Sequence, residues 1–79
     1  MGRSALITPA LEHYADGTVK FKGAYLGGQM HGHWEFFRTD GSMMRSGAFE
    51  RGGQVGVWRT YDRSGKVLKQ TDFDRRSRR

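Results

Sequence analysis

Short stretches of alternating apolar and polar residues make up most of the chain. Residues 18–26 and 42–50 are two such stretches, and each is followed by a glycine-rich turn and a short aromatic run, at 33–37 and 57–61. Alternation with a period of two is typical of β-strands, and no window of about 11 residues or more has helical periodicity. The pattern therefore predicts an all-β fold, an antiparallel meander of hairpins. Its strands, about six in number, are expected near residues 10–15, 18–26, 33–38, 42–50, 57–62 and 66–73.

The chain repeats with a period of 24 residues. Residues 14–37 align with residues 38–61, and a shortened third copy spans residues 62–73. The identical pairs are Asp16/Asp40, Gly17/Gly41, Gly23/Gly47, Ala24/Ala48, Gly28/Gly52, Gly32/Gly56 and Trp34/Trp58. Most are glycines, which indicates that backbone geometry is repeated and not a chemical site. The predicted organisation is an N-terminal arm (1–9), the repeats (10–73) and a basic tail (74–79).

Glycines divide the repeats into hairpins. The pairs Asp16-Gly17 and Asp40-Gly41 predict two-residue type I′ turns, because both central residues of such a turn need positive φ. The turn at Asp40-Gly41 would place Trp34 opposite Gly47 and Phe37 opposite Met44, and the next hairpin would place Trp58 opposite Thr71 and Tyr61 opposite Leu68. We expect an indole to cover the backbone of the glycine opposite it. The glycines expected to shape the turns are Gly17, Gly28, Gly32, Gly41, Gly52, Gly56 and Gly65.

The alternation gives the sheet one apolar face and one mixed face. The apolar face is predicted to carry Val19, Phe21, Tyr25, Trp34, Phe36, Met43, Phe49, Trp58, Val67 and Phe73. The mixed face is predicted to carry Lys20, Lys22, His33, Glu35, Ser46, Arg59 and Gln70, with Phe37, Met44, Tyr61 and Leu68 among them. A single sheet cannot hide both faces, so we expect self-association or a partner, unless residues 1–11 fold back as a cover. The candidate partner-binding residues are Phe21, Tyr25, Trp34, Phe36, Phe49, Trp58 and Phe73.

The repeat unit resembles the MORN repeat, in the variant found in YwqK-type antitoxin-repeat proteins. The resemblance rests on residues 17–25, on His31-Gly32-His33-Trp34, on residues 37–41 and on the second copy of that pattern at 56–65. It covers roughly residues 10–73 and implies stacked hairpins with a role in protein interaction. Phospholipid binding and toxin neutralisation are attached to some members. Val55 and Thr71 depart from the pattern, which suggests that the last unit caps the array.

Composition narrows the function classes. The chain has 79 residues and no cysteine, which leaves little room for a deep catalytic cleft and provides neither disulfides nor thiolate ligands. A cytoplasmic protein is the simpler interpretation. The formal net charge is +6, and half of it lies in the tail. The alternative function is therefore electrostatic binding of nucleic acid or anionic phospholipid head groups through the tail residues Arg75, Arg76, Arg78 and Arg79.

Other candidate chemistry has a structural explanation. His31 and His33 could hold zinc with a third ligand, but the second copy has Val55 and Val57 at these positions. The Gly27-Gly28 pair lacks the helix and the lysine of a phosphate loop. The aromatic residues could stack nucleic-acid bases, since they are interleaved with Lys20, Lys22, Arg38, Arg45 and Arg59, yet each also has a packing role in the repeat. We predict no catalytic residues, cofactor, metal or small-molecule substrate, and a non-enzymatic module whose apolar face binds a protein partner or a second copy.

Overall fold

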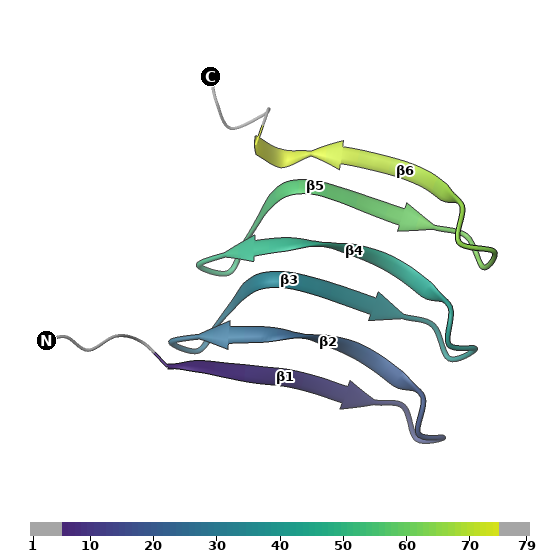
Figure 1. Cartoon of the computed structure of the whole chain (residues 1–79), viewed down its shortest axis with the longest axis horizontal. Helices are drawn as coiled ribbons and strands as arrows, with labels where there is room; N and C mark the ends of the chain where they lie inside the picture. The colour runs from purple at the N-terminus through teal and green to yellow at the C-terminus, as the bar shows by residue number, and fades with distance from the viewer. Residues whose placement is uncertain (1–5, 75–79) are drawn as a thin grey trace, which may run out of the picture.

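The computed structural model describes residues 6–74 and forms one antiparallel sheet in the order β1-β2-β3-β4-β5-β6 (Figure 1). The strands are β1 (Ile7–His13), β2 (Val19–Leu26), β3 (Gln29–Phe37), β4 (Met43–Glu50), β5 (Gly53–Tyr61) and β6 (Val67–Asp72). Every strand pairs with its neighbour in sequence, so the predicted all-β meander is confirmed. Residues 73 and 74 take a helical conformation. In residues 6–74 there is no helix long and apolar enough to cross a membrane.

Three strands begin earlier than the sequence pattern predicts. β1 starts at Ile7 inside the predicted arm, where it pairs with β2 and does not fold back over a face. β3 and β5 start at Gln29 and Gly53, four residues before the expected positions. The reason is that the turns before them are tight. Leu26 pairs with Gln29 and Glu50 with Gly53, which leaves two residues in each loop.

The type I′ turns connect β2 to β3 and β4 to β5. They do not lie at the Asp-Gly pairs, where the sequence predicts them. Gly27 and Gly28 have φ of 60° and 84°, and Arg51 and Gly52 have φ of 53° and 82°. Such consecutive left-handed residues define the two-residue hairpin turn. Arg51 is the one non-glycine residue with positive φ in the described part of the chain.

The Asp-Gly loops are three residues long, so the predicted two-residue turns there are wrong. In the second loop the Arg38 N–H donates to the Ser42 carbonyl (2.8 Å), and the Gly41 N–H donates to the Arg38 carbonyl (2.9 Å). Within this loop, Gly41 is the one residue with positive φ (90°). The Asp40 carboxylate accepts a hydrogen bond from the Ser42 N–H (2.9 Å). This local bond favours a type I turn closed by a left-handed glycine over a type I′ turn.

The longer loop changes the register near it. Trp34 pairs with Gly47 and Trp58 with Thr71, as predicted. Beyond a bulge, however, Phe37 pairs with Met43 and Tyr61 with Val67, and not with Met44 and Leu68. Because cross-strand partners share a face, these pairs move Met43 and Val67 to the mixed face. Val19 pairs with His13 across an equivalent bulge, so its predicted place among the aromatic residues is also wrong.

A second bulge places each indole over a glycine. Between the pairs Ala24–His31 and Lys22–Glu35, β2 has only Gly23 whereas β3 has three residues. Gly32 allows this with a φ of 76°, within a strand and not in a turn. A Cβ atom on Gly23 would lie 2.2 Å from the Trp34 ring, and one on Gly47 would lie 2.1 Å from the Trp58 ring. Each indole therefore covers the glycine of the preceding strand. Trp34 pairs with Gly47, but it covers Gly23.

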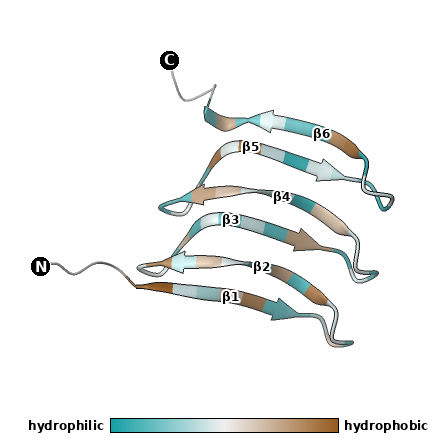
Figure 2. Ribbon diagram, viewed as in Figure 1, coloured by the Kyte–Doolittle hydropathy of each residue, from teal (hydrophilic) through white to brown (hydrophobic). Residues whose placement is uncertain are grey.

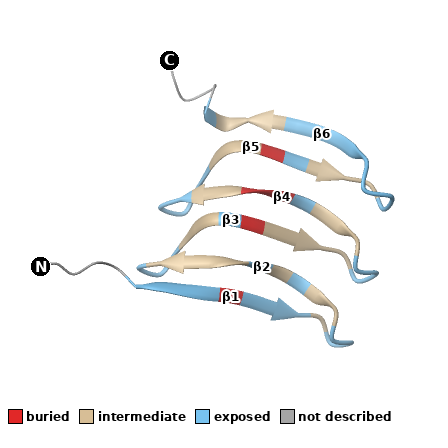
Figure 3. Ribbon diagram, in the orientation of Figure 1, coloured by how far each residue is buried: buried red, intermediate tan, exposed pale blue. Residues whose placement is uncertain are grey.

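The sheet is a single layer with a thin core. Its principal extents are 46 × 36 × 11 Å. Ala10, Trp34 and Trp58 are the buried apolar side chains of residues 6–74, and they lie in a band across the middle of the strands (Figure 3). Apolar and polar residues alternate along the ribbons, as Figure 2 shows. The indoles cover the backbone in the middle of the sheet, on a face that a second layer would usually cover.

Candidate functional site

Six of the seven predicted partner-binding residues form one aromatic cluster. Neighbouring ring centroids lie 5.0–6.2 Å apart in tilted, stacked and edge-to-face arrangements. The cluster consists of Phe21, Tyr25, Trp34, Phe36, Phe49 and Trp58. We call the side of the sheet that carries them the aromatic face. Phe73 lies next to the cluster, where it lines a small hollow together with Trp58 and Lys69.

The cluster has a buried lower layer and a half-buried upper layer. Trp34 is 0% exposed and Trp58 is 5% exposed. Their indole N–H groups donate to the carbonyls of Ala24 (3.1 Å) and Ala48 (3.0 Å), which fixes both rings on the strand before them. The phenyl and phenol rings around the indoles are half-buried. The tryptophans therefore support the face, and the phenylalanines and Tyr25 present it.

Arg45 also belongs to the aromatic face, a role that the sequence pattern did not predict. Its guanidinium carbon lies 4.9 Å from the Phe36 ring centroid and 5.6 Å from the Trp58 centroid. Arg45 holds the repeat position that Phe21 holds one unit earlier, and Phe21 contacts Trp34 in the same way, at 5.5 Å. A planar cation thus replaces a ring over the indole, an arrangement stabilised by the cation–π interaction. The repeat alignment contains this signal, because it pairs Phe21 with Arg45.

One cross-strand row of the aromatic face holds an acidic side chain and two basic ones. Its members pair in order across all six strands: Glu12, Phe21, Phe36, Arg45, Thr60 and Lys69. The row has an acid on β1, two rings in the first half and two cations in the second half. The aromatic face is therefore polarised from β1 to β6.

The mixed face pairs its polar groups with one another. Glu35 lies 3.8 Å from Lys22 and 3.3 Å from His33. Arg59 donates to the side chain of Gln70 (3.0 Å). Of the five basic residues expected among the aromatic residues, Arg45 alone contacts the cluster in the described structure. Lys20 lies over the Tyr14 ring at 5.7 Å, outside the cluster.

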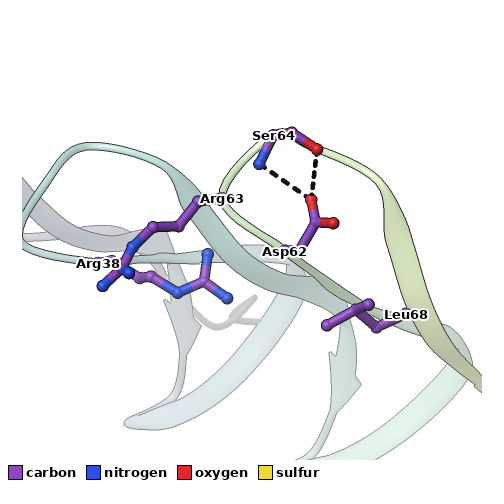
Figure 4. A pocket seen from close by; sticks show the side chains of 5 residues that line it. All are labelled: Arg38, Asp62, Arg63, Ser64 and Leu68. Carbon is purple, nitrogen blue, oxygen red and sulfur yellow. Dashed lines mark hydrogen bonds between the residues drawn. The ribbon is translucent and has the colours of Figure 1, made fainter.

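The hairpin loops at one side of the sheet surround a shallow hollow, whose residues are drawn in Figure 4. The Arg38 guanidinium donates to Ser42 Oγ (3.2 Å) and to the carbonyls of Met43 and Tyr61. Arg63 forms an ion pair with Asp40 (2.8 Å). Both arginines are thus engaged in joining neighbouring loops, and the hollow is a structural junction between repeats.

Three aspartates stabilise these loops and have lowered pKa values. A hydrogen bond from the Thr18 backbone lowers the pKa of Asp16 below its usual 3.8. The Ser42 hydroxyl and backbone N–H lower that of Asp40, and Arg63 adds to the effect. The Ser64 hydroxyl and the Lys66 N–H lower that of Asp62. Each carboxylate is therefore more favourable in the folded chain than in the unfolded chain.

We expect acid to destabilise the protein through these loops. Because the folded pKa values are lower, the stabilisation is present above about 3.8 and is lost as the pH falls toward the folded values. Asp62→Asn should flatten the decrease in unfolding free energy between about pH 5 and pH 2. Urea melts over this range measure it. Glu50→Gln, which removes one acid outside the loops, is the matched control. An equal acid response in both variants would contradict the assignment.

The histidines do not assemble a metal site. His33 contacts Glu35, and the His31 backbone carbonyl accepts a hydrogen bond from Trp34 (3.2 Å). Within residues 6–74, no group of three histidine, cysteine, aspartate or glutamate side chains is placed to hold a metal ion. The arginines proposed for the alternative function, Arg75, Arg76, Arg78 and Arg79, lie outside the described residues.

Comparison of the chain with family models, with curated proteins and with solved structures gave no match. The aromatic face and its polarised row of charges are therefore interpreted from their own geometry.

Proposed function

We propose that the protein is a non-enzymatic interaction module that binds a protein surface through its aromatic face. The observation that carries the proposal is the single layer: no other element of residues 6–74 covers the aromatic cluster. A sheet normally buries its apolar face against a second layer. The outer rings of the cluster are half-buried and remain partly open to solvent, and apolar patches that stay accessible are typical of interaction sites.

The chemistry of the face suits protein binding. Phe21, Phe36 and Phe49 are held by contacts to the buried indoles, so they lose little side-chain entropy on binding. Aromatic residues and arginine are the side chains most often responsible for binding energy at interfaces. Arg45 provides the arginine near the centre of the cluster. The face therefore combines rigid apolar anchors with a group that selects acidic or aromatic partners.

The resemblance to the MORN repeat supports an interaction role, and an antitoxin-like component is the narrower form of this proposal. A chain without cysteine suits a cytoplasmic location. The alternative, an electrostatic binder of nucleic acid or anionic lipid, is favoured by the formal charge of +6. Against base stacking, the two indoles are buried, and Lys22 and Arg59 point to the mixed face with their partners. Binding through phosphate contacts weakens steeply with salt, whereas apolar docking does not.

Affinity capture from the native host tests the proposal, with nuclease present and washes at about 0.5 M salt. The intact chain should retain a protein, and Phe36→Ser should lose it. Leu68→Ser, which changes an exposed side chain in the bulge of β6, outside the aromatic cluster, is the matched control. Capture of no protein under these conditions, with nucleic acid or lipid retained only when nuclease is omitted and the salt is low, would contradict the proposal.

A further inference from the structure

We infer that the aromatic face binds a second copy of this chain, face to face, with the strand order reversed so that β1 lies over β6. This inference rests on the proposed function and names the partner. In this arrangement a two-fold axis runs parallel to the strands, between β3 and β4. Each residue then faces a residue at the same position along the strand direction. That residue lies on the strand that takes its place in the reversed order.

The single-layer shape of the sheet favours stacking. The chain extends 46 × 36 × 11 Å along its principal axes, so it is broad and one sheet thick. A sheet with an uncovered apolar face is stabilised when a second layer packs on it. The two long dimensions give a face large enough for the roughly 800 Å² that each partner buries in a stable interface. Two such faces would pack about 10 Å apart and form a sandwich.

The ends of the array disfavour the other simple assembly, in which β6 of one copy pairs with β1 of the next. Inside the sheet, each indole covers the glycine of the preceding strand. Ala10 of β1 takes the repeat position of the indoles, and Thr71 of β6 takes that of the glycines. An end-to-end contact would therefore lack both halves of the pair. Pro9 on β1 also removes a backbone donor from that edge.

The row of charges makes the face self-complementary in the proposed orientation. Reversing the strand order places Glu12 over Lys69 of the second copy, and Phe36 over Arg45 of the second copy. The first pair is an ion pair and the second a cation–π contact, and symmetry doubles both. The other two-fold arrangement places β1 over β1 and separates Glu12 from both cations. The charges thus select one orientation.

In this orientation, the strands covered by indoles in one copy face strands of the other copy that are not covered. Trp34 covers Gly23 on β2, and Trp58 covers Gly47 on β4. With the order reversed, these two strands face β5 and β3 of the second copy, which carry no overlying indole. The side-chain layer, with the buried indoles at its base, is therefore thicker over β2 and β4 of one copy and meets the thinner layer over β5 and β3 of the other. Interdigitation of this kind is how packed sheets reach the density of a protein interior.

Sedimentation equilibrium with charge-swap variants of the whole chain tests the inference. The wild type should be a dimer. Glu12→Lys and Lys69→Glu should each raise the dimer Kd about tenfold, because each alters two symmetric pairs at once. The double variant, with the charges exchanged, should return to within about threefold of the wild type. Glu50→Lys and Lys66→Glu are exposed controls with the same changes in charge, and they should leave the Kd unchanged, singly and together.

A folded chain that remains monomeric at high concentration would overturn the inference. So would a dimer whose Kd follows net charge alone, with the controls and the swaps equivalent, or a double variant that fails to recover. The proposed function is tested separately. If the chain is monomeric but Phe36→Ser abolishes capture of another protein, the face is a docking surface for a different partner. If capture is also unaffected, both proposals fail.

Discussion

Trp34→Ala and Trp58→Ala should each lower the free energy of unfolding by about 3–5 kcal/mol. Both rings are buried, contact several aromatic neighbours and donate a hydrogen bond to the preceding strand. Their removal leaves a cavity and exposes the glycine beneath. Small domains are stable by only about 5–15 kcal/mol, so either variant removes a large part of the total.

Urea or thermal melts followed by circular dichroism measure these losses. Leu68→Ala is a suitable control because that side chain is 64% exposed, and it should melt within about 0.5 kcal/mol of the wild type. Tryptophan variants as stable as the control would show that the indoles are not the core of the sheet.

Gly23→Ala and Gly47→Ala should each destabilise the sheet by about 3 kcal/mol, although they add only one methyl group. The new Cβ would lie 2.2 Å from the Trp34 ring in the first variant and 2.1 Å from the Trp58 ring in the second. The indole would have to leave its position, and its hydrogen bond and ring contacts would be lost with it. The near-ultraviolet circular dichroism of the tryptophans should change along with the melting temperature.

Thr71 provides the matched control for this prediction. It holds the same repeat position on β6 as Gly23 and Gly47 hold on β2 and β4, and it already carries a side chain. Thr71→Ala should therefore change the stability much less than either glycine variant. Equal effects at the three positions would mean that β-strand propensity, and not the covering indole, determines the residue found there.

The repeat made the strands and their order predictable, but not the geometry of the turns. The Asp40-Gly41 pair matches the pattern of a type I′ turn, and only the hydrogen bond from Ser42 to the Asp40 side chain distinguishes the three-residue loop. The extra loop residue is compensated by a bulge between the loop and the Trp34–Gly47 pair. For this reason that distant pair was predicted correctly while Phe37 and Met43 were not.

The candidate site was predictable in its rings and less so in its charges. Alternation is sufficient to place Phe21, Phe36 and Phe49 on one face. Whether Trp34 is presented or buried depends on the bulge at Gly32, which the sequence indicates only as a repeated glycine. In the sequence, Arg45 is indistinguishable from a solvent-exposed charge. Only the strand register shows that it lies over Phe36. Side-chain position within a row is a property of register, and register is set by loops.

Hydroxyl-radical footprinting of the assembled protein tests the central claim most directly, because it reports which face is covered, whatever the partner. The aromatic face is reported by Phe21, Phe36 and Phe49, and the mixed face and its loops by Tyr14, Phe37 and Tyr61. As the complex or dimer forms, oxidation of the first three rings should fall several-fold while oxidation of the second three stays constant. Protection of the second set, with the first set as reactive as in the free chain, would contradict the claim that the aromatic face is the binding surface.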